Sequence, residues 1–347
     1  MKPRLHFYGK YMGDMKIIFN TIKSTNDYDI SYDLTGFGSS RRIRNPQYII
    51  TSHSMPNYVK NNSKEVHMRH GYGVFPWIPD KNKKDELLKD YEKFYGFRIF
   101  GDKDYKVFKD WGIPEKRLMM IGLPFSVDLL SLNNNDERIK FLKSKNLDPE
   151  KNTILYAPTW THYEERGFFV EWYKNKEDEK EKINSLCKFI TEYLNCNFII
   201  RFHEKHRYNE DYLNMYKDIL NKENIYSTYL VEDEVDNISY LKYTEVLIGD
   251  LSSVNVWYYV MDKPVVHIGL KPFFNCVNKG LAGLDYDDRV GYVTDNFNIM
   301  LDNIEDSLIN PYKFSDKRQT LVSKCMKYMG KQSTEAIKEE FKRVCIN

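Results

Sequence analysis

The stretch "EVLIGDLSSVNVWYYV" (residues 245–260) decides the fold class of this chain. "EVLIG" is apolar enough for a buried strand, and "SVNVWYYV" continues as a helix. Between the strand and the helix lies the short junction Asp250-Leu251-Ser252-Ser253, with no glycine-rich loop. A buried strand that passes directly into a helix is typical of a parallel α/β sheet, so the stretch predicts an α/β fold.

The same alternation of strand and helix runs through the chain in two series. The first series has apolar runs at 5–9, 46–53, 64–77, 96–100 and 117–130, and the second has runs at 153–160, 197–205 and 226–233 ahead of the opening stretch. Helical patterns over 178–195, 211–223 and 235–244 separate the later runs. Two such series predict two doubly wound domains with a cleft between them, and ligands of such sheets bind at the carboxyl ends of the strands.

Apolar density falls between residues 131 and 151, where we place the domain boundary. The predicted organisation is a Rossmann-like domain over 1–130 and a second over 131–325. A C-terminal helix follows in 326–347, with packing back onto the first domain as its expected position.

Composition narrows the range of functions. The 347 residues include 52 basic and 50 acidic side chains, for a net charge of +2, so the chain lacks the strong positive field of a protein that binds duplex nucleic acid. Five scattered cysteines predict reduced thiols rather than a zinc site. No signal peptide opens the chain and no window of 18 apolar residues occurs, which predicts a cytoplasmic protein without a membrane span.

The junction of the opening stretch is the first candidate site. Ser252 and Ser253 fall at the start of a helix, where backbone N–H groups lack partners and an anion such as phosphate is stabilised. Paired hydroxyl groups favour this interpretation. The alternative is that the serines only cap the helix, a common role for this residue type.

A second candidate follows the strand "NFII" in the segment "RFHEKHR" (201–207). Arg201 and His203 are two residues apart on the predicted strand and would therefore share one face near its carboxyl end. Together with His206 and Arg207 they concentrate positive charge. The alternative is an exposed strand end with solvated cations.

"HMRHGYG" (67–73) offers a histidine next to glycines. Gly71 lets the backbone turn sharply beside His70, and histidine is the side chain best suited to take a hydroxyl proton near neutral pH. His53 and His67 are competing candidates of lower rank. A turn histidine without a chemical role is the alternative.

In "YAPTW" (156–160), Pro158 ends a strand and Thr159 and Trp160 then face the predicted cleft. Trp160 could stack on a base, although packing is the favoured role. The glycine fingerprints of ATPases and dinucleotide enzymes are absent from the sequence. We identify no dedicated metal site, although Asp285 and Asp287 could hold a Mg²⁺ ion beside a nucleotide diphosphate.

Several of these motifs together resemble the CDP-glycerol glycerophosphotransferase family, which includes teichoic acid primases and polymerases and related capsule polymerases. The motifs follow the family's order from residue 45 to 341: "HMRHGYG", "MMIGLPFSVDLL", "ILYAPTW", "IIRFHEK", "VLIGDLSSVNVWYYVMDKPVV" and "GKQSTEAIKEEF". The resemblance implies a GT-B architecture with the nucleotide-bound donor on the second domain and the acceptor on the first. Arg69, on the acceptor side, stands where the family has Trp, and Glu204 where it has Pro.

The resemblance also implies a reaction. A phosphopolyol would move from a CDP-activated donor to a hydroxyl of a lipid-linked or polymeric acceptor, with release of CMP, in the synthesis of teichoic acid or a capsule-type polymer. His70 would take the hydroxyl proton, Arg201, His203, Ser252 and Ser253 would hold the pyrophosphate, and Asp250 would orient the loop.

Two alternative functions stay open at this point. One alternative is a GT-B glycosyltransferase that uses a nucleotide sugar, and another is a catalytically silent protein that binds an anionic polymer.

Lipid-linked acceptors also suggest peripheral contact with the cytoplasmic face of the membrane. The segment 81–97 mixes lysines with aromatic residues, as interfacial helices do, but an ordinary surface helix is the favoured interpretation.

Overall fold

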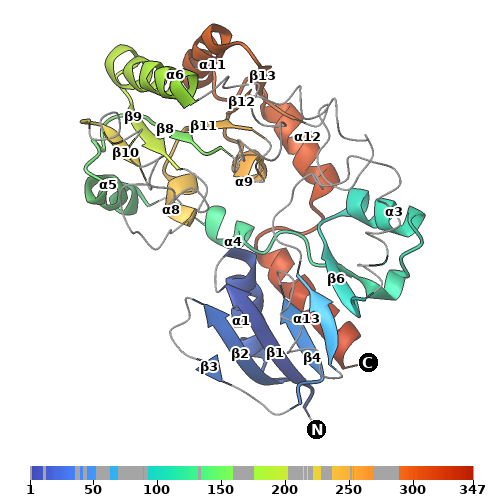
Figure 1. The fold of residues 1–347 in the computed structure, drawn as a ribbon. Coiled ribbons are helices and arrows are strands. Elements are labelled where there is room, and N and C mark those ends of the chain that lie inside the picture. Colours follow the sequence, from blue (N-terminus) through green and yellow to red (C-terminus); the bar gives the residue numbers. More distant parts are fainter. Residues whose placement is uncertain are drawn as a thin grey trace. The chain divides into compact units, whose positions relative to one another are not determined.

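The computed structural model places two compact α/β units, coloured along the chain in Figure 1. It describes residues 2–10, 13–35, 40–41, 45–51, 63–68, 89, 93–131, 134–158, 176–201, 214, 217, 222–227, 237–250, 252, 254–268 and 289–346. The first unit lies within Met1–Leu130 and Val322–Asn347, and the second within Ser131–Val277 and Leu284–Leu321.

The first unit is built on a seven-stranded sheet in the order β3-β2-β1-β4-β5-β6-β7. All neighbouring strands are parallel except β2 and β3, which pair antiparallel at one edge. In chain order its elements are β1 (Arg4–Lys10), α1 (Gly13–Thr25), β2 (Asp29–Thr35), β3 (Ser40–Arg41), β4 (Tyr48–Thr51), β5 (Lys64–His67), β6 (Gly96–Ile99), α3 (Asp102–Asp110), η3 (Glu115–Arg117), β7 (Leu118–Met120), α4 (Ser126–Leu129) and α13 (Lys331–Cys345).

Helices from the two ends of the chain cover one face of this sheet (Figure 1). Helix α1 buries Met15, Ile18, Phe19 and Ile22, the spacing of a single helical face. Helix α13 buries Ile337, Phe341 and Val344 in the same core. The ring of Phe7 on β1 meets Phe19 edge-on at 5.3 Å and stacks on Phe341 at 6.4 Å. The first core therefore requires residues more than 300 positions apart.

The second unit has a six-stranded sheet in the order β10-β9-β8-β11-β12-β13, with every neighbouring pair parallel. Numbered along the chain, this is the order 3-2-1-4-5-6 of a Rossmann sheet. Its elements are α5 (Asn135–Ser144), β8 (Thr153–Tyr156), α6 (Lys176–Lys188), η4 (Phe189–Tyr193), β9 (Asn197–Ile200), β10 (Ile225–Ser227), α8 (Asn237–Lys242), β11 (Val246–Gly249), α9 (Val254–Val260), β12 (Val265–Ile268), β13 (Tyr292–Thr294) and α11 (Phe297–Ile309), and α12 (Ser315–Cys325) follows them.

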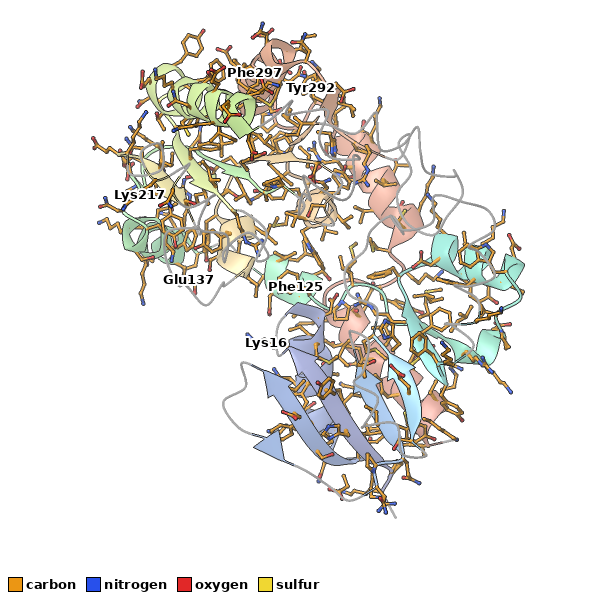
Figure 2. The ribbon with its side chains drawn as sticks, in the orientation of Figure 1. Lys16, Phe125, Glu137, Lys217, Tyr292 and Phe297 are labelled. Atoms are coloured by element: carbon orange, nitrogen blue, oxygen red, sulfur yellow. The ribbon has the colours of Figure 1, made fainter. Side chains whose placement is uncertain are left out.

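Strands β8, β9, β11 and β12 are buried at every position, as expected for a parallel sheet covered on both faces. On one face, Ile183, Leu186 and Ile190 from α6 and η4 join Met300 and Ile304 of α11 in one core. Tyr292 of β13 and Phe297 at the start of α11, both labelled in Figure 2, pack against this core. Burying one such side chain stabilises a fold by about 1.5–3 kcal/mol.

The alternation of strands and helices predicted from the sequence is present in both units. Among the boundaries that differ from the prediction, the end of β9 bears on the site. Strand β9 ends at Ile200, so Arg201 is the first residue beyond the strand and the argument that Arg201 and His203 share a strand face does not hold. Within the described residues, no helix is both long enough and apolar enough to cross a membrane.

Candidate active site

The order of the second sheet fixes where a ligand would bind. Strands β8 and β11 are neighbours in the sheet, and the chain leaves β8 in one direction and returns on its other side at β11. In open α/β sheets, ligands bind at the carboxyl ends of the strands beside such a switch in strand order. The segments that begin at Ala157 and at Asp250 leave the sheet at this point.

Three strand ends meet at this edge. The N–H of Ala157 donates to the carbonyl of Ile248 at 3.1 Å, which joins the end of β8 to β11. The N–H of Arg201 donates to the carbonyl of Tyr156 at 2.8 Å, which joins the end of β9 to β8. Pro158, half-buried, follows Ala157. Since neighbouring strands lie about 4.8 Å apart, the backbone at Arg201 and at Asp250 is about 10 Å apart along one edge of the sheet.

The loop after β11 is a closed turn. The Oδ1 atom of buried Asp250 accepts the N–H of Ser252 at 3.0 Å, and the hydroxyl oxygen of Ser252 accepts the N–H of Val254 at 3.3 Å. Ser252 thus caps the start of α9, which is the alternative role considered from the sequence. The carboxylate of Asp250 holds the loop at the carboxyl end of β11.

Asn255 stabilises this turn by a hydrogen bond from the buried side. Its side-chain Nδ2 donates to the carbonyl of Asp250 at 2.6 Å, and the residue is fully buried. A Cβ atom on Gly249 would lie 2.4 Å from the Oδ1 atom of Asn255, so any larger residue before Asp250 would displace the Asn255 amide. Sequence reasoning did not identify Asn255. A polar residue in the first turn of an apolar helix was the available signal.

A buried polar network lies behind the loop. The hydroxyl of Tyr259 is 2.8 Å from Nε2 of His267, which is paired with Gly249 across β11 and β12. The same hydroxyl accepts the N–H of Val290 at 3.2 Å. Burial, together with the charge of Arg289, lowers the pKa of His267 to about 3, and hydrogen bonds to the backbone of Val290 and Asp250 offset only part of this shift.

These groups are neutral near pH 7, because burial also raises the pKa of Tyr259 to about 12. Neutral side chains at Tyr259 and His267 can hold the Asp250 loop without adding to the buried charge of the neighbouring Arg289. Neither Tyr259 nor His267 was identified from the sequence, since both lie in segments that look uniformly apolar. The strand position of His267 beside Gly249 is visible only in the folded sheet.

Most of the other predicted site residues lie outside the described part of the chain. They are Arg69, His70, Gly71, Thr159, Trp160, His203 and Ser253, and the competing candidate His53. Asp285 and Asp287, considered as metal ligands, and residues 81–88 of the predicted interfacial segment are outside it as well. Among the described residues, no group of three His, Cys, Asp or Glu side chains is placed to hold a metal ion.

Comparison with known proteins identifies the family. A sequence model described as CDP-Glycerol:Poly(glycerophosphate) glycerophosphotransferase matches residues 11–341. The chain belongs to this family. The match confirms the resemblance carried by the sequence motifs and extends it upstream through α1.

One curated relative and several solved structures are similar to this member of the family. A teichoic acid poly(glycerol phosphate) polymerase from Bacillus spizizenii is 26% identical over 251 residues, which cover 70% of this chain and 56% of the relative. The chain thus spans little more than half the length of that relative. A wall teichoic acid polymerase, TagF, matches with a TM-score of 0.71 and 16% identity over 98% of this chain and 89% of that chain, and TagF has also been solved after a soak with CDPG.

The S. aureus protein MnaA in complex with UDP matches with a TM-score of 0.59 and 12% identity, over 99% of this chain and 96% of that one. At such low identities these structures establish the fold alone. They confirm the predicted GT-B class, in which two Rossmann-like units are joined in one chain.

Proposed function

We propose that this family member transfers a phosphopolyol from a CDP-activated donor to a hydroxyl of a lipid-linked or polymeric acceptor, and that it releases CMP. The observation that carries the proposal is the family match over 11–341, which includes the segments that leave the second sheet at its switch in strand order. The name of the Bacillus relative, a poly(glycerol phosphate) polymerase, supports a polyol phosphate as the transferred group. Synthesis of a teichoic acid is the corresponding role.

The proposed chemistry is an in-line displacement at the β-phosphorus of the donor. A bond forms between the acceptor oxygen and phosphorus, and the bond from phosphorus to the bridging oxygen breaks, with its electron pair leaving on CMP. Since the charge on the transferred phosphoryl group spreads over its oxygens, fixed donors and positive charge provide most of the catalysis. His70 is the proposed acceptor of the hydroxyl proton, with Arg69 and Gly71 beside it in the sequence.

The donor pyrophosphate is proposed to bind at the edge formed by the ends of β8, β9 and β11. The backbone N–H of Arg201 donates to the end of β8 at this edge, and His203 is two residues further along the chain. Ser252 would supply the hydrogen of its hydroxyl, because its N–H already donates to Asp250, and Ser253 would supply its hydroxyl and N–H groups. Asp250 orients this turn rather than acting as a base, because its carboxylate already accepts the N–H of Ser252.

The remaining parts of the proposal concern the nucleotide, a metal and the location in the cell. Pro158 ends the segment along which Thr159 and Trp160 would line the nucleotide. A Mg²⁺ ion could accompany the pyrophosphate. Lipid-linked acceptors would bring the protein to the cytoplasmic face of the membrane.

Nucleotide release tests the proposal directly. Purified protein is incubated with CDP-glycerol, CDP-ribitol, UDP-glucose or GDP-mannose and a membrane fraction that contains acceptor, and the released nucleotide is identified by chromatography. We expect CMP from one of the CDP-polyols. Release of UDP or GDP would instead support the glycosyltransferase alternative, and binding of polymer without any nucleotide release would support a silent binding protein.

A variant pair locates the donor site. Arg201→Ala is expected to reduce the rate of CMP release by about a hundredfold or more, the usual effect of losing one charge-stabilising donor. Lys180→Ala on the exposed side of α6 is the matched control and should leave the rate unchanged. An Arg201→Ala rate within threefold of the wild type would remove Arg201 from the donor site.

A further inference from the structure

The first unit contains a cavity that the proposed reaction does not use. It lies at the amino ends of β1 and β2 and beside the last turn of α1, near the N-terminal end of the chain in Figure 1. Its volume of about 690 Å³ is within the range of ligand-binding sites in proteins. Ligands of the proposed reaction would bind at the carboxyl ends of the strands, so this cavity is a separate place on the unit.

The lining of the cavity is basic. Of the described residues that line it, Lys2, Arg4 and Lys23 are cations and Asp29 is a carboxylate, which gives the lining a net charge of +2. The entire chain of 347 residues carries the same net charge. A cation keeps its field when it also has other contacts, so the lining as a whole attracts an anion.

Lys2 is held in place at this cavity. Its ammonium group donates to the backbone carbonyl of Asn26 at 2.5 Å and to Oδ1 of the same residue at 3.1 Å. Asn26 follows α1 with a φ angle of +58°, a left-handed conformation that Asn adopts more readily than most residues. An ammonium group has three donors, so one remains for a ligand or for water. Because Asn26 orders the side chain in advance, binding a ligand costs less conformational entropy.

The cavity also has a buried apolar lining. Tyr28 and Ile30 belong to the core of the unit and are only 6% and 8% exposed. The ammonium group of Lys23 lies 5.6 Å from the centroid of the Phe19 ring, which meets the ring of Tyr32 edge-on at 5.3 Å. A cation beside an aromatic ring keeps its charge. Basic and apolar surfaces side by side suit a chain in which phosphate groups alternate with short carbon units.

We propose that this cavity binds the phosphodiester chain of a polymeric acceptor at a distance from its reacting end. This inference rests on the proposed function, because it takes the polyol phosphate polymer of that function as the ligand. Strand β1 has 7 residues and is therefore about 23 Å long, which separates the cavity from the carboxyl edge of the sheet. Only an acceptor with several repeats reaches both places. The cavity would therefore favour long acceptors over short ones.

Binding is measured by fluorescence anisotropy with a labelled decamer of glycerol phosphate at 50 and 200 mM NaCl. Lys2→Gln and Lys23→Gln should each weaken binding about threefold, and the double variant about tenfold. The slope of log affinity against log salt should become shallower in the double variant by up to about 1.4, since each cation contributes about 0.7 on single-stranded nucleic acids. Lys106→Gln is the matched control: Lys106 is exposed on α3 outside the cavity, and its loss should change nothing.

Asp29 provides a test in the opposite direction. Asp29→Asn removes the carboxylate from the lining and should tighten binding of the decamer about threefold, an effect that the loss of a structural contact does not produce. Asp33→Asn, on the same strand but outside the cavity, is its control and should leave the affinity unchanged. Wild-type affinity for the decamer in both Asp29→Asn and the double lysine variant would overturn the proposal.

Three other probes distinguish a polymer from smaller or membrane-bound anions. Inorganic phosphate and monomeric glycerol phosphate should compete with the decamer only weakly, and binding to phosphatidylglycerol vesicles should be the same in wild type and in the double lysine variant. Inorganic phosphate that binds as tightly as the decamer would show a site for a single anion. Loss of vesicle binding in a double variant that still binds the decamer would show a site for lipid headgroups. Either result overturns the polymer site.

Kinetics separate this inference from the proposed function. With a decamer acceptor, the double lysine variant should raise the acceptor KM about tenfold, with little change in kcat or in the KM for the CDP-polyol. With a monomeric acceptor its kinetics should match the wild type. Release of CMP by a variant that keeps the wild-type KM for the decamer would overturn the polymer site and leave the reaction in place. Decamer binding that depends on Lys2 and Lys23, in a protein that releases no CMP, would overturn the reaction instead.

Discussion

The side-chain amide of Asn255 lies 2.6 Å from the carbonyl oxygen of Asp250 and closes the loop at the switch point of the second sheet from its buried side. Gly249 has no side chain at the one position where a Cβ atom would collide with this amide. The two residues are six apart in the sequence but act as one packing unit. Changes at either residue should therefore affect the loop that carries Ser252.

Asn255 and Gly249 are expected to be energetically coupled. Asn255→Ala leaves the carbonyl of Asp250 short of a buried partner and should cost about 1–3 kcal/mol in the free energy of unfolding. Gly249→Ala should cost at least as much, whereas the double variant should cost less than the sum, because the second change removes the atom that the new Cβ meets. Urea denaturation of the four proteins measures the coupling. Asn310→Ala, which loses only an exposed bond to Asp306, is the control. Strict additivity would contradict this packing.

His267 is expected to make the second unit sensitive to acid. Its pKa of about 3 in the folded protein is below its usual value of 6.5, so the unfolded chain binds more protons between these values. Stability from this site is complete above pH 6.5 and is lost as pH falls, by up to about 1.4 kcal/mol per pH unit. Denaturation of wild type and His267→Gln from pH 7 to pH 4 tests this. The difference between the two should shrink on acidification, and parallel curves would show that His267 does not titrate in this range.

Lys263 is expected to make the stability of the second unit depend on pH in the alkaline range. Its ammonium group donates to the carbonyls of Leu241, Lys242 and Thr244 at 3.3, 2.6 and 2.7 Å, at the end of α8. Burial lowers its pKa to about 8 from 10.5, so between these values the folded protein has released a proton that the unfolded chain still holds.

Stability at this site should therefore increase with pH from 8 to 10.5, by up to about 1.4 kcal/mol per unit. The difference in free energy of unfolding between wild type and Lys263→Met, measured at pH 7.5 and at pH 10, should change in favour of the wild type. An unchanged difference would mean that Lys263 keeps its usual pKa in the folded protein.

Gly122 in the first unit is expected to tolerate no side chain. Its φ angle is +71°, and a Cβ atom there would lie 2.2 Å from the carbonyl oxygen of Tyr328. Gly112 is a matched control, with a φ angle of +85° and no neighbouring atom within 4 Å of the point where a Cβ would lie. Gly112→Ala should cost about 1 kcal/mol from backbone strain alone, and Gly122→Ala should lower the melting temperature considerably more. Equal costs would show that the contact with Tyr328 relaxes freely.

The sequence predicts the fold class well because the signal is local. In "EVLIGDLSS", an apolar run that ends at an acid and two hydroxyls already defines a strand end, and the structure places it beside β8. The end of β9 was harder to predict. The alternating pattern continues past Ile200 into polar residues, and only the paired neighbours show that the strand stops there.

The supporting residues were missed for a different reason. Asn255, Tyr259 and His267 lie in segments whose composition is that of a core helix and a core strand. Their roles depend on contacts with the carbonyl of Asp250 and the N–H of Val290, which tertiary packing alone brings together. Buried polar residues within apolar runs are the signal to look for. The predicted roles of His70, His203 and Ser253 stay predictions.

Placing α13 in the first core has a consequence for biosynthesis. The ribosome has synthesised the described strands of the first sheet once it reaches Met120. It synthesises the core residues of α13 much later, namely Ile337, Phe341 and Val344. At 5–20 residues per second, the interval between Leu130 and Lys331 is about 10–40 s. The nascent second unit can close during that interval, so the unit made first is the last to become complete. Until then its open apolar face is a target for chaperones.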